Sequence, residues 1–132
     1  MTEQHRFSMR TPLGRVRHLG SAHHGTRQFW HQRLTSVANV PLTIAVIAII
    51  MGLLGRNHAA VVQILGSTFV SIVMLLFVVS GIYHMWLGMQ VIIEDYVHDE
   101  LPKFFMLMCN TFFSAAVAMT AVFAILKLSF GL

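Results

Sequence analysis

Charged side chains and cysteine are both scarce in this chain of 132 residues. Only 11% of the residues are charged, against roughly 25% in soluble domains, while 56% are hydrophobic and the mean hydropathy is +0.70. These values exclude an ordinary water-soluble domain, and we expect no separate soluble catalytic domain. The single cysteine, Cys109, excludes an intrachain disulfide and argues against a thiolate metal site. The composition therefore predicts an all-α integral membrane protein.

Three apolar runs are each long enough to cross a bilayer, which takes about 20 helical residues. They cover residues 34–54, 61–93 and 104–130. The second run is apolar from Ala59 onward and exceeds the thickness of the hydrocarbon layer, so we expect its helix to tilt or to project beyond the membrane. The expected organisation is a polar arm over residues 1–33 and a three-helix transmembrane domain over residues 34–132.

Positive charge is concentrated before the first apolar run. Because cytoplasmic segments of membrane proteins are enriched in Lys and Arg, we expect the N-terminus in the cytoplasm, or in the matrix of a mitochondrion. Nucleic-acid binding is not expected, because this charge is not spread over a folded surface. The first apolar run starts too late for a secretory signal peptide. We therefore expect this run to remain in the protein as a transmembrane span. The arginines concerned are Arg6, Arg10, Arg15, Arg17, Arg27 and Arg33.

His84 is the clearest candidate for a functional polar residue within a span. Charged side chains near a span centre cost about 2.5 to 3.5 kcal/mol, so an ionisable residue there needs a reason. A neutral imidazole can bind haem iron axially. On a helix, Gly88 lies about 40° from His84 and Gly81 about 60° on the other side, which would leave room for a flat porphyrin. The alternative is that these glycines admit another helix, with the histidine donating a hydrogen bond to it.

Asp95 and Tyr96 follow His84 by about three helical turns, roughly 16 Å along the same helix. A phenol beside a carboxylate at the membrane boundary can hydrogen-bond a quinone carbonyl and help to supply protons. An interfacial tyrosine with a solvated aspartate is the alternative. Arg33 lies at the same boundary, where it could pair with haem propionates, with Asp95 or with lipid phosphates. Three further histidines are assigned no metal: His23, His24 and His31.

Two motifs stand out on either side of the first span. His84-x-x-x-Gly88 is followed by Asp95-Tyr96 on the second span. The segment that enters the first span reads Gly20-Ser21-Ala22-His23-His24-Gly25-Thr26, and then Phe29-Trp30-His31-Gln32-Arg33-Leu34-Thr35. In this order and spacing, the motifs resemble those of the small hydrophobic membrane-anchor subunit of succinate dehydrogenase. The resemblance covers residues 20–96, and the third span matches only as an apolar helix.

In that family a flavoprotein subunit oxidises succinate to fumarate, and electrons pass through iron–sulfur clusters to a quinone held by the anchor subunits, which usually also bind haem b. The resemblance implies that His84 is an axial haem ligand, that Arg33 lies near the haem propionates, and that Tyr96 donates a hydrogen bond to the quinone beside Asp95. No second histidine lies within a span. The other ligand of a six-coordinate haem is therefore expected from a companion cytochrome b anchor subunit.

The expected function is that of a non-catalytic anchor subunit that shares a helix bundle with this companion and docks the iron–sulfur and flavoprotein subunits. The expected cofactors are a haem b shared with the partner and a quinone, taken to be ubiquinone. The resemblance begins at Gly20 and leaves a short arm for a transit peptide, which favours a bacterial inner membrane over a mitochondrial one. The alternative is a structural anchor or assembly protein that contacts no cofactor. An ion-translocating subunit is disfavoured, because no carboxylate or lysine lies in mid-span.

Overall fold

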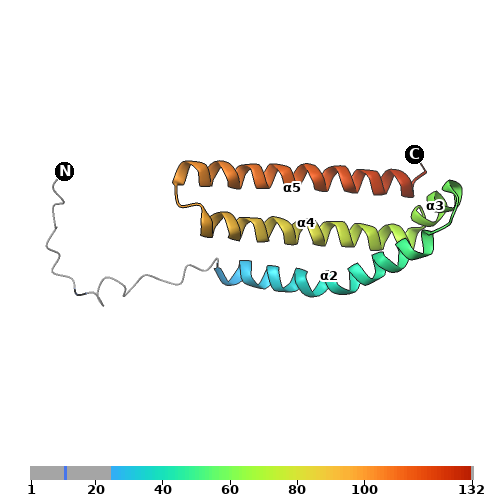
Figure 1. Cartoon of the computed structure of the whole chain (residues 1–132), viewed down its shortest axis with the longest axis horizontal. Coiled ribbons are helices and arrows are strands. Elements are labelled where there is room, and N and C mark those ends of the chain that lie inside the picture. Colours follow the sequence, from blue (N-terminus) through green and yellow to red (C-terminus); the bar gives the residue numbers. More distant parts are fainter. Residues whose placement is uncertain (1–10, 12–24, 132) are drawn as a thin grey trace.

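A computed structural model describes residue 11 and residues 25–131, and its regular structure over this part is entirely helical. The helices are α2 (Gly25–Leu53), α3 (His58–Leu65), α4 (Thr68–Tyr96) and α5 (Glu100–Ser129) (Figure 1). Three of them, α2, α4 and α5, are long and apolar enough to cross a membrane, which confirms the predicted fold class. The start of α2 and the end of α5 lie at opposite ends of the bundle, as three crossings require.

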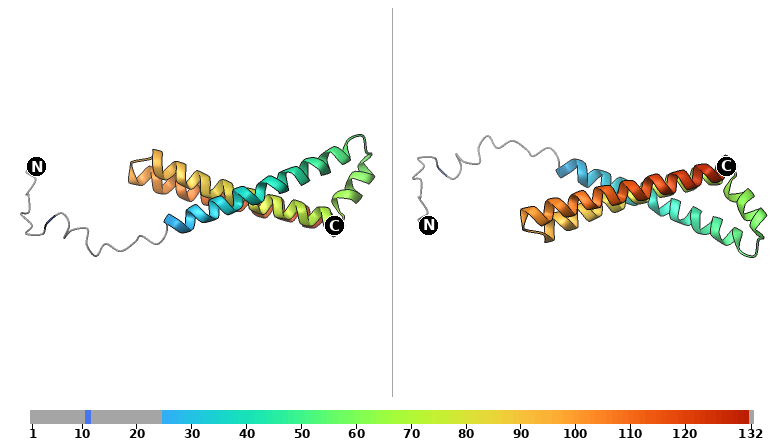
Figure 2. Two further views of the ribbon diagram at one scale, coloured as in Figure 1. Left: turned by 90° about the horizontal axis from the view of Figure 1, so that it is seen from below. Right: turned by 90° about the horizontal axis from the view of Figure 1, so that it is seen from above.

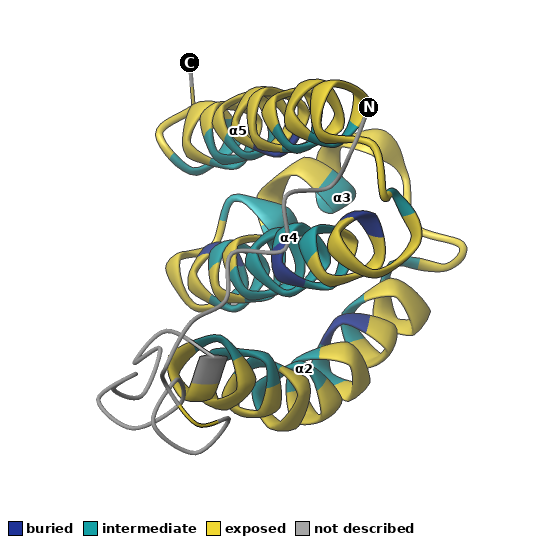
Figure 3. Cartoon of the chain, turned by 90° about the vertical axis from the view of Figure 1, so that its left-hand side faces the viewer, coloured by how far each residue is buried: buried dark blue, intermediate teal, exposed yellow. Residues whose placement is uncertain are grey.

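Helix α4 is the middle layer of the bundle, with α2 on one side and α5 on the other (Figure 3). Helix α5 runs alongside α4 in the opposite direction, whereas α2 crosses α4 at an angle (Figure 2). Few apolar side chains are buried between these layers, and they include Val46 on α2 together with Leu87 and Ile93 on α4. Most large apolar side chains lie on the outside, where lipid or a partner helix can cover them.

Helix α2 begins nine residues before the predicted span. Residues 25–33, which the sequence analysis assigned to the arm, are helical and extend along α4, where Arg27, Gln28 and His31 line a cavity with α4 residues. Two polar side chains of this segment, His31 and Gln32, contact Tyr83 and His84 of α4. The remaining arm, including the segment from Gly20 to His24, lies outside the described residues.

A break divides the apolar run expected over residues 59–93 into α3 and α4. The side chain of Asn57 caps α3 by accepting a hydrogen bond from the Ala60 N–H at 2.9 Å. Ser67 has an extended backbone, and its carbonyl accepts the bond that opens α4, from the Ser71 N–H. Glycine and serine are common helix-end residues, so Gly66-Ser67 is the local signal for this break.

Gly66 lies where α3 and α5 come close together. A Cβ atom at this position would lie 3.1 Å from the Leu128 carbonyl oxygen at the end of α5. This distance is tighter than ordinary van der Waals contact, and backbone atoms have little freedom to yield. The absence of a side chain at position 66 therefore fixes how closely α3 packs on α5.

Gly66→Ala should lower the free energy of unfolding by about 1 kcal/mol, because the added methyl group forces the Leu128 backbone away. Gly52→Ala is the matched control, since a Cβ there has no neighbour within 4 Å and alanine favours helix. Thermal unfolding of the detergent-purified protein, followed by circular dichroism, measures both. Equal melting temperatures for the two variants would contradict this packing.

Candidate functional site

The His84 side chain on α4 points to α2 and is half-buried there. Its Nδ1 lies 3.0 Å from the Thr35 hydroxyl oxygen, and its Nε2 lies 3.5 Å from the amide nitrogen of Gln32. Both contacts come from one turn of α2. The imidazole is thus held between two spans, with a short polar contact on one ring nitrogen and a long one on the other.

A second set of polar contacts lies beside this ring and joins all three long helices. His31 Nδ1 on α2 is hydrogen-bonded to the Tyr83 hydroxyl on α4, and Tyr83 stacks on Trp86 with 5.8 Å between ring centroids. The Trp86 indole donates to the Thr111 hydroxyl on α5 at 3.2 Å, and the Asn110 amide donates to the Trp86 carbonyl at 3.1 Å. His31, to which the sequence analysis assigned no metal, is therefore part of the packing between α2 and α4.

The two glycines that flank His84 have different surroundings. A Cβ added at Gly88 would lie 3.3 Å from the Gln32 amide nitrogen, whereas one added at Gly81 would meet nothing within 4 Å. Gly88 thus permits the close approach of α2 beside His84, and Gly81 borders open space. This difference was not evident from the helical wheel, because the wheel gives the face of a residue but not its neighbour.

Asp95 and Tyr96 are exposed at the C-terminal end of α4, where the Tyr96 side chain is 79% accessible. Arg33 is also exposed, and its guanidinium carbon lies 4.9 Å from the centroid of the Phe29 ring. Asp95 and Tyr96 lie at the bundle end where α2 begins and α4 ends (Figure 1), whereas Arg33 lies further along α2, two residues before Thr35. The structure places none of these three side chains in hydrogen-bond contact with His84, whose partners are Thr35 and Gln32.

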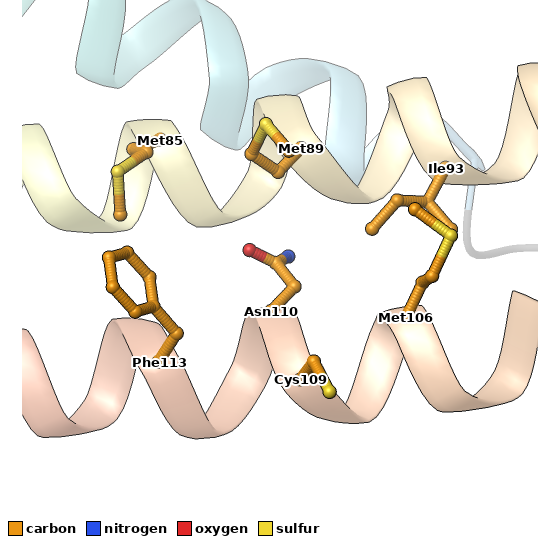
Figure 4. A pocket seen from close by; sticks show the side chains of 7 residues that line it. All are labelled: Met85, Met89, Ile93, Met106, Cys109, Asn110 and Phe113. Carbon is orange, nitrogen blue, oxygen red and sulfur yellow. The ribbon is translucent and has the colours of Figure 1, made fainter.

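Two cavities adjoin the site on either side of α4. A polar one of about 310 Å³ lies between α2 and α4, where the buried Gln28 amide nitrogen has no hydrogen-bond partner among the described residues. An apolar one of about 460 Å³ lies between α4 and α5 (Figure 4). Figure 4 shows Met85, Met89 and Ile93 of α4 facing α5 across this cavity. Cys109 borders it and is a free thiol, consistent with the absence of a disulfide.

Thr35 and Gln32 are the site residues that the sequence analysis missed. Both lie within the motif quoted for the start of the first span, but nothing in that pattern indicates contact with His84, which follows them by 49 and 52 positions. Among residues 11 and 25–131, no group of three or more His, Cys, Asp or Glu side chains could hold a metal ion.

Comparison with known proteins places the chain in a family. Residues 8–126 match the family described as succinate dehydrogenase/fumarate reductase transmembrane subunit, and the chain belongs to this family. It is 28% identical over 121 residues to the succinate dehydrogenase hydrophobic membrane anchor subunit of Paracoccus denitrificans, covering 92% of this chain and 93% of that one. It is 24% identical over 122 residues to the protein of the same name from Rickettsia bellii (strain RML369-C), with 92% and 90% covered.

No solved structure gives a significant match to the chain. The family match confirms the resemblance inferred from the sequence motifs, and it extends that resemblance through most of the third span. It leaves the roles of individual residues as predictions.

Gly88→Leu should lower the free energy of unfolding by about 1 kcal/mol, because the leucine side chain has too little room beside the Gln32 amide. Gly81→Leu on the same helix is the control, since its side chain enters open space and should change stability by less than about 0.5 kcal/mol. Thermal unfolding in detergent compares the two variants. An equal loss of stability in Gly81→Leu and Gly88→Leu would contradict the difference between the surroundings of the two glycines.

Proposed function

We propose that the chain is the membrane anchor subunit of a succinate dehydrogenase, that it co-ligates haem b through His84, and that Tyr96 and Asp95 form part of the quinone-reduction site. Membership of the transmembrane subunit family supports the anchor role. The observation that carries the haem assignment is the environment of His84, whose ring is held between two spans with one nitrogen in a short contact and the other facing a displaceable side chain.

The residues around His84 fit an axial haem ligand. The Nε2 atom faces only a long contact from Gln32, and the Gln32 amide oxygen is buried with no hydrogen-bond partner within the described part of the chain. Moving this amide aside therefore breaks little, and Gly88 adds no side chain in its place. When bound, haem b would supply a one-electron carrier within the membrane.

Arg33 supports the same assignment from a position on α2 close to Thr35, which contacts His84. Its guanidinium is exposed on the first part of α2, two residues before Thr35, and a guanidinium binds carboxylates in a bidentate manner. We assign it to the haem propionates. We assign the second axial ligand to a companion cytochrome b anchor subunit, because His31, the other histidine on the three long helices, is already hydrogen-bonded to Tyr83.

The quinone assignment is supported by position and exposure. Tyr96 and Asp95 end α4 at the bundle end that also holds the start of α2, and both are accessible. A phenol hydroxyl there can donate to a quinone carbonyl, and the adjacent carboxylate can help to deliver protons that quinone reduction consumes. The quinone, which we take to be ubiquinone, would receive electrons from succinate oxidation through the iron–sulfur and flavoprotein subunits.

The arginine-rich N-terminal sequence supports a cytoplasmic N-terminus. That orientation would place Tyr96, Asp95 and the start of α2 on the cytoplasmic side, where soluble subunits can dock. We assign the protein to a bacterial inner membrane, and both reported relatives are bacterial anchor subunits.

One observation favours a second candidate function, that of a structural anchor without cofactor contact. The contacts of His84 with Thr35 and Gln32 would also suit a histidine that serves only to join α2 to α4. Polar side chains do hold membrane helices together in this way. The two functions differ in whether iron binds Nε2, so spectroscopy separates them.

His84→Ala should abolish or broaden the b-type haem signal in the reduced-minus-oxidised spectrum of the purified complex, because the axial nitrogen is lost. His58→Ala is the matched control, since His58 is an exposed residue at the start of α3 and its loss should leave the spectrum intact. Flavin content reports assembly in each preparation. An unchanged haem spectrum in assembled His84→Ala complex would leave only the structural function.

Tyr96→Phe should lower succinate:quinone activity about tenfold, which corresponds to one lost hydrogen bond of about 1.4 kcal/mol. Succinate oxidation with a soluble dye should stay unchanged, because it bypasses the quinone. His58→Ala, an exposed position at the opposite end of α4 from Tyr96, should preserve both activities. Parallel loss of the two activities in Tyr96→Phe would instead assign Tyr96 to assembly.

A further inference from the structure

We propose that Thr35 is the positioning residue for the haem ligand: its hydroxyl fixes the orientation and tautomer of the His84 ring, so that Nε2 is the nitrogen offered to iron. This inference rests on the proposed function, and it concerns a residue on a different helix from the ligand. It follows from three distances at one oxygen atom.

The Thr35 hydroxyl oxygen lies 2.8 Å from the His31 carbonyl oxygen, 3.1 Å from the Gln32 carbonyl oxygen and 3.0 Å from His84 Nδ1. A hydroxyl has a single proton, and carbonyl oxygens can only accept. Threonine hydroxyls within helices commonly donate to the carbonyl four residues earlier, which here is that of His31. The oxygen is then left as an acceptor for an N–H group on His84 Nδ1.

A neutral imidazole has one N–H group and one lone pair. With the proton on Nδ1, the lone pair of His84 is on Nε2. The contact on that side agrees, because the amide nitrogen of Gln32, which lies 3.5 Å from Nε2, can only donate. The neighbours on both sides of the ring therefore select the tautomer in which Nε2 is the ligand atom.

The two contacts differ in strength. The Thr35 contact has ordinary hydrogen-bond length, whereas 3.5 Å to Gln32 is at the outer limit. Iron that takes the Nε2 lone pair would displace the weaker contact and leave the Thr35 bond in place. Through that bond, Thr35 would hold the ring plane and increase the electron donation of the imidazole, as outer-shell partners of metal-ligating histidines do.

Stronger donation stabilises ferric over ferrous iron, so loss of the acceptor should raise the haem midpoint potential. We therefore expect Thr35→Val, which keeps the shape but not the hydroxyl, to raise the potential and to shift the electron paramagnetic resonance signal of the oxidised haem. Haem retention should weaken about tenfold or more. Thr35→Ser keeps the hydroxyl and should restore the parent values.

Thr43→Val is the matched control. Thr43 also lies on α2, and its hydroxyl donates to the Asn39 carbonyl at 2.7 Å, but it is exposed and lies about two turns beyond Thr35. Thr43→Val removes the same kind of hydrogen bond from a threonine hydroxyl to a helix carbonyl, but it leaves the surroundings of the His84 ring unchanged. The potential and resonance signal of this variant should match those of the parent complex.

Redox titration and spectroscopy of the assembled complex decide the matter. A parent-like potential and signal in Thr35→Val would overturn the role of Thr35, while loss of haem in His84→Ala would still uphold the proposed function. Retention of haem in His84→Ala would contradict both the role of Thr35 and the proposed function. Should the valine variant fail to assemble, Thr35→Ala removes the hydroxyl without adding bulk, and the same two outcomes apply to it.

Discussion

The polar contact of α2 with α4 around the His84 ring is the constraint on which the site depends. Within a bilayer no water is present to satisfy polar side chains, so they must find partners in the protein. His84 is hydrogen-bonded to Thr35, and Tyr83 is hydrogen-bonded to His31, which lies one turn before Thr35 on α2. These contacts fix the approach of α2 to α4, and Gly88 allows that approach to be close. The ring nitrogen that remains available is a consequence of this packing.

The sequence predicted the helical fold, the three spans and the polar candidate in the second span, because each of these follows from local composition and helical periodicity. The structure extends α2 back to Gly25, within the segment that the sequence analysis assigned to the arm, and His31 and Gln32 there contact α4. The break at Gly66 was also missed within a continuous apolar run. Thr35 could not be predicted as a neighbour of His84, because no local pattern encodes a contact across 49 residues.

The single chain leaves much of its apolar surface uncovered. Large apolar side chains are exposed along all three long helices, and the proposed haem would need a second ligand besides His84. Both features suit a subunit whose outer faces are covered by lipid and by neighbouring helices. The exposed end that bears Tyr96 and Asp95 suits contact with subunits outside the membrane. The proposed haem and quinone roles thus belong to different depths of one helix, α4.

The most direct measurement is an electron cryo-microscopy structure of the purified complex at a resolution that defines the His84 ring. We expect Nε2 to be bound to haem iron, Nδ1 to remain on the Thr35 hydroxyl, and the Gln32 amide to have left the ring. A ring that still contacts Gln32, with the iron held by other residues, would contradict the central claim and leave this chain as an anchor alone.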